Sequence, residues 1–116
     1  MRFLLAALLI LAPGLALAHS ELSGSTPPQG ARLAAPPGEF VLRFNEPVQV
    51  TSLRLFDAAG QALPLQREGD AAPRREARAT PAAPLPPGAL RLEWRAISAD
   101  GHPIRGSLRF TWEATR

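Results

Sequence analysis

The segment from residue 90 to residue 97 alternates between apolar and charged side chains, and this pattern limits the possible folds more than any other feature. Its even positions are apolar, and its odd positions carry Arg91, Glu93 and Arg95 before Ile97. Successive side chains of a β-strand point to opposite faces. The pattern therefore predicts a strand with one buried face and one solvated face.

Other segments of the chain also have the features of β-strands. Residues 107–112 repeat the alternation, with three apolar side chains expected to face inward together: Leu108, Phe110 and Trp112. Residues 40–44 and 51–57 are rich in strand formers, and residues 66–84 predict a loop with one or two exposed strands. Most of the 13 prolines lie between these segments, where their missing N–H breaks no ladder. We predict a single all-β domain, a two-sheet sandwich of about seven strands.

The first residues of the chain have the layout of a secretory signal peptide. Met1 and Arg2 give a positive start, residues 3–11 form an apolar run, and the sequence ending at Ala18 matches the small-x-small cleavage pattern. The run is shorter than the roughly 20 apolar residues that a spanning helix needs. We expect cleavage after Ala18 and a mature domain of residues 19–116 that is exported from the cytoplasm without membrane insertion. The alternative is an N-terminal membrane anchor.

The composition excludes several classes of protein. The chain has no Cys, so disulfides, thiolate metal sites and Cys nucleophiles are absent. The only methionine is Met1, which the predicted cleavage removes. The formal net charge is only +3, and arginines alternate with acidic residues along the sequence, as in residues 67–76. We therefore expect no cationic patch and no nucleic-acid partner.

Cleavage after Ala18 would make His19 the first residue of the mature chain, where its α-amine and its Nδ1 could chelate one metal ion. The other histidine is His102, two residues after Asp100, so both side chains would project to one side of an extended backbone. Together these groups offer three nitrogens and one oxygen, a donor set that suits Cu(II), with Zn(II) as a weaker alternative. Each signal alone is weak, because Asp-Gly is a common turn pair. Their joint occurrence supports a metal site.

Three blocks of the sequence resemble one known family. They are residues 19–36, residues 42–48 and residues 85–110, the last of which includes Trp94-Arg95-Ala96-Ile97-Ser98-Ala99-Asp100-Gly101-His102-Pro103. Over these blocks the chain is similar to the CopC family of periplasmic copper-resistance proteins. The resemblance implies an immunoglobulin-like Greek-key β-sandwich that carries or buffers copper in copper resistance or homeostasis. It also implies a receiving partner, an inner-membrane copper transport protein.

The resemblance further implies one Cu(II) ion per mature chain, bound by His19, Asp100 and His102. Glu46 matches a family carboxylate near the copper, and we assign it a supporting role, orienting His19 or a bound water. The alternative for Glu46 is an ordinary exposed turn residue. The Met-rich Cu(I) site of some family members cannot form in a mature chain without methionine. We expect Trp94 and Phe44 to belong to the core.

Two other classes of function stay open, although we expect no enzyme. A histidine-brace copper enzyme that cleaves polysaccharides oxidatively also uses an N-terminal histidine. Such enzymes usually add an axial tyrosine, and this chain has no Tyr. Asp100 would also fill a position that oxygen chemistry needs open. The third class is a structural immunoglobulin-like module whose metal binding is incidental, and it would lack tight, stoichiometric Cu(II) binding.

Overall fold

The computed structural model describes residues 20–115, so the predicted signal peptide, its cleavage after Ala18 and His19 lie outside the described residues. The described part of the chain is all β. Its strands are β1 (Leu22–Thr26), β2 (Arg32–Leu33), β3 (Phe40–Phe56), β4 (Ala62–Leu63), β5 (Leu65–Arg67), β6 (Arg74–Pro81), β7 (Gly88–Ile97) and β8 (Pro103–Trp112). In this range no helix is long and apolar enough to cross a membrane.

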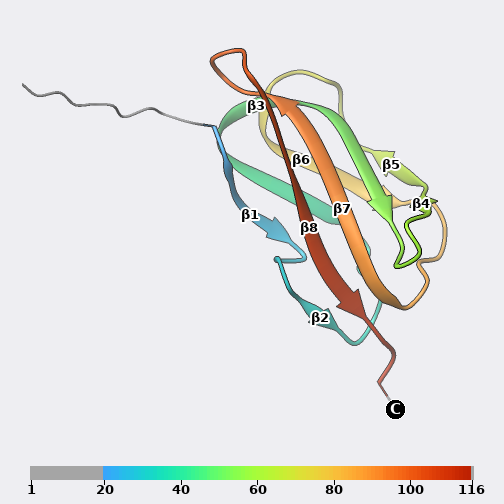
Figure 1. The fold of residues 1–116 in the computed structure, drawn as a ribbon. Helices are drawn as coiled ribbons and strands as arrows, with labels where there is room; N and C mark the ends of the chain where they lie inside the picture. The colour runs from blue at the N-terminus through green and yellow to red at the C-terminus, as the bar shows by residue number, and fades with distance from the viewer. Residues whose placement is uncertain (1–19, 116) are drawn as a thin grey trace, which may run out of the picture.

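The strands form two sheets that share β3 (Figure 1). Sheet A has the order β1-β3-β6-β5, and sheet B has the order β2-β8-β7-β3-β4. All pairs are antiparallel except β2 with β8. This arrangement confirms the predicted all-β sandwich, with eight strands in the described residues where about seven were expected.

Strand β3 joins the two sheets because its halves pair with different partners. Residues 40–44 pair with β1 and β6, whereas residues 49–56 pair with β7. The register on the β6 side shifts between Arg43 and Val48, where the strand changes sheets. The two segments that the sequence marks as rich in strand formers, residues 40–44 and 51–57, are therefore parts of one strand. Pro47 lies in the shifted stretch between them, where its missing N–H interrupts no regular ladder.

Apolar side chains from both sheets fill the space between them. Phe44 of sheet A meets Trp94 of sheet B edge-on, with ring centroids 5.2 Å apart and ring planes at 80°. Such a T-shaped contact suits the charge distribution of two aromatic rings. Both residues belong to the core, as predicted. Leu108 and Phe110 are buried as expected, and Trp112 is partly buried against the core.

Trp94 depends on a glycine of the neighbouring strand. Gly106 is its cross-strand partner in the β7–β8 ladder. A Cβ atom placed on Gly106 would lie 2.7 Å from Cζ2 of the indole, closer than atoms in contact approach. The ring therefore fills the space that any other side chain at position 106 would need.

We predict that Gly106→Ala lowers the free energy of unfolding by about 1–3 kcal/mol, because the added methyl group overpacks the core against Trp94. Urea unfolding followed by Trp fluorescence measures the change. Gly38→Ala is the matched control, since a Cβ on Gly38 meets nothing within 4 Å. Equal stability of the two variants would contradict this close approach.

Candidate metal centre

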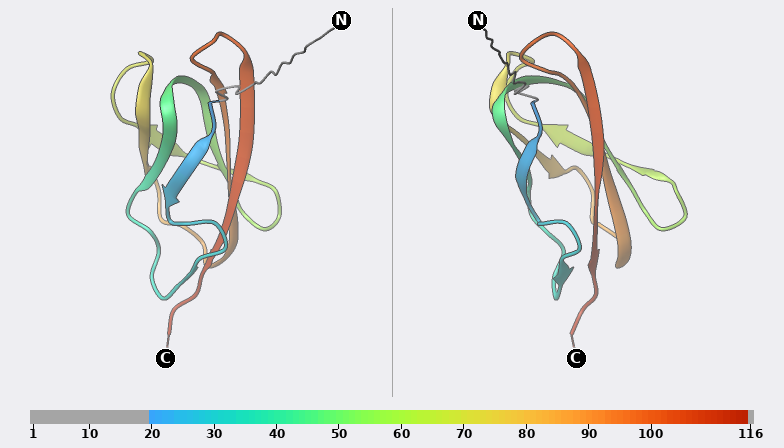
Figure 2. Two further views of the ribbon diagram at one scale, coloured as in Figure 1. Left: turned by 90° about the vertical axis from the view of Figure 1, so that its left-hand side faces the viewer. Right: turned by 60° about the vertical axis from the view of Figure 1, so that its left-hand side comes forward.

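The loop from Ser98 to His102 connects β7 to β8 at the end of the sandwich where β1 begins (Figure 2). The Ser98 N–H donates to the His102 carbonyl at 2.7 Å, and the Gly101 N–H donates to the Ser98 carbonyl at 2.9 Å. Gly101 has φ 89°, a conformation that glycine adopts without strain. A tight turn, and not an extended backbone, therefore brings Asp100 and His102 to one side.

Ser98 organises the side chains of this loop. Its hydroxyl, buried at the end of β7, donates to Oδ1 of Asp100 and accepts the His102 N–H at 3.0 Å. Oδ1 of Asp100 also lies 3.1 Å from Nδ1 of His102. The carboxylate and the imidazole are thus held against each other, although both side chains are mostly exposed to solvent.

The contacts of Asp100 stabilise its ionised form. They lower the pKa of this carboxyl from 3.8 to about 2, chiefly because the Ser98 hydroxyl donates a hydrogen bond and then because His102 does. The carboxylate is therefore charged throughout the pH range in which proteins function. It is available as an oxygen ligand without losing a proton first.

Ser20 links the loop to the bend of β3. Its hydroxyl donates to Oε2 of Glu46 at 3.0 Å and accepts the Ala99 N–H at 3.1 Å. Next to it, the Glu21 N–H donates to Oδ1 of Asn45 at 2.7 Å. Ser20 is only 8% exposed, and the two hydrogen bonds of its hydroxyl are partly buried. The first described residue is therefore anchored between β3 and the loop that carries Asp100 and His102.

These contacts place three of the four predicted site residues. Asp100 and His102 touch, and Glu46 is connected to their loop through Ser20. Glu46 is partly buried within β3, which excludes the alternative of an exposed turn residue. His19 lies outside the described residues. Between residues 20 and 115 no group of three or more His, Cys, Asp or Glu side chains could hold a metal ion.

Sequence reasoning missed the two serines of this centre. Ser98 continues the even-numbered, inward phase of β7, so a hydroxyl at this position was a detectable signal of a buried polar contact. Ser20 gave no signal beyond its place next to His19. Its partners Glu46 and Ala99 are far away in the sequence, and only the fold brings them to it.

Comparison with known proteins gives consistent results. Residues 22–113 match the CopC domain family. Copper resistance protein C of Pseudomonas syringae pv. tomato is 34% identical over 110 residues, which cover 87% of this chain and 86% of the relative. The structure of CopC from Methylosinus trichosporium OB3b superimposes with a TM-score of 0.72 at 28% identity, covering 84% of this chain and 97% of the other. PcoC, a methionine-rich copper resistance protein from Escherichia coli, gives a TM-score of 0.65 at 31% identity, covering 83% of this chain and 100% of the other.

We predict that Ser98→Ala raises the pKa of Asp100 from about 2 toward its ordinary value of 3.8, because the largest stabilising contact of the carboxylate is lost. A ¹³C NMR titration of the Asp100 carboxyl measures this shift. Ser107→Ala, at an exposed position of β8, is the control and leaves the titration unchanged. A pKa still near 2 in the Ser98 variant would mean that His102 alone stabilises the ionised form.

Proposed function

This chain belongs to the CopC domain family, and from that premise we propose that its mature form, residues 19–116, carries one Cu(II) ion in the periplasm. It is a copper-binding protein of the copper-resistance class. The observation that carries the proposal is the anchored position of Ser20 beside the loop of Asp100 and His102.

The first part of the proposed site is His19, exposed as the N-terminal residue by cleavage after Ala18. Chain geometry keeps its Cα atom about 3.8 Å from that of Ser20. Because the Ser20 hydroxyl contacts Glu46 and Ala99, a residue joined to Ser20 is within reach of the loop that carries Asp100 and His102. The free α-amine and Nδ1 of His19 would together chelate the ion.

The second part of the proposed site is the Asp100–His102 pair. Nδ1 of His102 faces Asp100, so Nε2 is the nitrogen left for a metal. Ser98 and His102 both contact Oδ1 of Asp100, and Oδ2 is the oxygen that these two contacts leave. A carboxylate that holds a ligating imidazole in place is a common support in metal sites. Glu46 would support His19 in the same way through Ser20.

The donor set favours Cu(II) over other ions. Amine, imidazole and carboxylate suit Cu(II), which binds most tightly among the divalent first-row metals, so Zn(II) would bind more weakly. The chain has no Cys, and its only methionine is Met1. It therefore lacks the soft ligands that Cu(I) prefers, unlike the methionine-rich protein to which it is similar.

A carrier or buffer fits this site better than an enzyme. The side chains of Asp100 and His102 are 66% and 76% exposed, which would let a receiving protein approach the ion. We propose that the receiver is a copper transport protein of the inner membrane. An oxidative enzyme with a histidine brace would usually add an axial tyrosine, and the chain has none.

Adding one residue before His19 should lower Cu(II) affinity by about a hundredfold or more, because the amine becomes an amide and the chelate is lost. Competition with a chelator of known affinity measures this change. The control adds the same residue after Arg116, since β8 runs away from the loop between β7 and β8 and ends at Trp112, at the other end of the sandwich (Figure 1). Equal affinity of both versions would contradict ligation by the amine, and weak binding by both would contradict the copper assignment.

Cu(II) affinity should fall as the pH drops from about 8 to about 5, because protons compete with the metal ion for the nitrogen ligands. Asp100 adds nothing to this fall, since the pKa of its carboxyl is lowered to about 2. Chelator competition at several pH values measures the slope. Asp100→Asn should lower the affinity at every pH in this range, because the charged oxygen ligand is lost. An affinity independent of pH would contradict nitrogen ligation.

A further inference from the structure

The outward face of sheet B gathers arginines from three neighbouring strands. We call these residues and the single acid among them the arginine face: Arg54 of β3, Arg91, Glu93 and Arg95 of β7, and Arg105 and Arg109 of β8. The register places Glu93 beside Arg54, and it pairs Arg91 with Arg109. The expectation that the basic residues form no cationic patch was wrong, because strand pairing brings together charges that acidic residues separate along the sequence.

Charge is segregated over the molecule. Five arginines and one glutamate give the arginine face a formal charge of +4. The other described residues contain six arginines and nine acidic side chains, a formal charge of −3. Segregation of this kind orients a charged partner before contact and speeds association.

The fold gains little from this arrangement. Arg91 lies opposite Arg109 and Arg95 lies opposite Arg105, and like charges in directly opposite positions destabilise a sheet. Among the described residues, the only ion pair of these arginines joins Arg91 to Glu93, at 2.8 Å. The guanidinium groups of Arg95, Arg105 and Arg109 therefore remain available to a partner.

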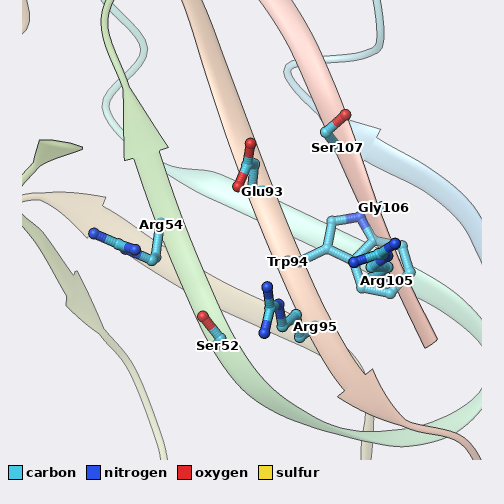
Figure 3. Close-up of a pocket in the computed structure, with 8 residues that line it drawn as sticks. All are labelled: Ser52, Arg54, Glu93, Trp94, Arg95, Arg105, Gly106 and Ser107. Carbon is cyan, nitrogen blue, oxygen red and sulfur yellow. The ribbon is translucent and has the colours of Figure 1, made fainter. Parts of the chain in front are cut away.

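A hollow of about 490 Å³ lies within the arginine face (Figure 3). Arg54, Arg95 and Arg105 line it together with Glu93 and the hydroxyl groups of Ser52 and Ser107. Planar guanidinium groups bind carboxylates through two parallel hydrogen bonds, and hydroxyl groups can donate to the same oxygens. The hollow thus presents several hydrogen-bond donors to a carboxylate of a partner. Glu93 presents its own carboxylate to a hydrogen-bond donor of that partner.

We propose that the arginine face docks an acidic segment of a partner protein, with Asp or Glu side chains entering the hollow. Charge complementarity is the first argument. The second is that Glu93 in the middle of the face offers a carboxylate oxygen to the hydroxyl or amide donors of a peptide. The third is that the large aromatic ring of this face, Phe56, lies beneath the guanidinium groups of Arg54 and Arg91 at 5.1 and 4.8 Å and does not protrude to insert into a bilayer.

The arginine face also adjoins the candidate metal centre. Arg95 and Arg105 are cross-strand partners in the β7–β8 ladder. Two residues further along, Ile97 and Pro103 form the last pair before the loop that carries Asp100 and His102. A docked segment would therefore lie about 7 Å from the start of that loop. The docking itself needs no metal, so it is tested with metal-free protein and stands apart from the copper assignment.

The test measures binding of a fluorescent octapeptide of alternating glutamate and serine to the metal-free mature protein. Fluorescence anisotropy is recorded at about 0.01 M salt, where the Debye length is about 30 Å, and again at about 0.1 M, where it is about 10 Å. The double variant Arg95→Gln/Arg105→Gln removes two charges from the arginine face. The matched control, Arg74→Gln/Arg75→Gln, removes two exposed charges from β6 of sheet A. Amide NMR shifts show which strands the peptide touches.

We expect saturable binding that weakens with salt, with amide shifts in β7 and β8. The arginine-face variant should bind at least about fivefold more weakly and the control less than about twofold. Equal weakening in both variants would overturn the proposal, because net charge alone would then explain binding. Absence of binding would overturn it too. Tighter binding of the same face to phosphatidylglycerol vesicles, or self-association of the protein through it, would assign the face to a membrane or to a second copy instead.

Discussion

The crossing of β3 between the two sheets is the constraint on which the rest of the structure depends. Its first half pairs with β1 and β6, and its second half pairs with β7. One continuous strand thus supplies Phe44 to one wall of the core and Leu53 to the other wall. The bend between these halves places Glu46 at the same end of the sandwich as the loop that follows β7, and Ser20 connects the two. The candidate metal centre is therefore a product of this bend as much as of its own residues.

Features that depend on one strand alone, such as which of its side chains face inward, could be predicted from the sequence. Burial of one face leaves an alternating pattern, so β7, β8 and most of their inward side chains could be predicted. Features that depend on pairing could not be predicted. Pro47 resembles a strand end, because nothing in the sequence reveals that the ladder is already shifted there. The contact between Ser20 and Glu46 spans 26 positions and leaves no local pattern.

The charges of the surface illustrate the same limit. Along the chain Arg91 and Arg95 flank Glu93, and the sequence looks balanced. In the sheet Arg91 lies opposite Arg109, and Arg95 lies opposite Arg105. One side of the molecule therefore carries a net positive charge, and the other described residues together carry a net negative charge. A formal charge of +3 for the whole chain conceals this separation. The loop of Asp100 and His102 lies at the border of the arginine face, so a partner recognised by charge would approach the proposed copper site.

The hydrogen bond from Ala99 to Ser20 joins residues 79 positions apart. Closing so long a loop costs chain entropy, and the pairing of β1 with β3 and of β3 with β7 helps to offset that cost. The end of the sandwich that holds this bond therefore depends on the β3 bend and the β7–β8 hairpin being in place together. A chain that is partly unfolded lacks this end, even when each of its side chains is present. Metal binding at this end would thus be restricted to fully folded molecules.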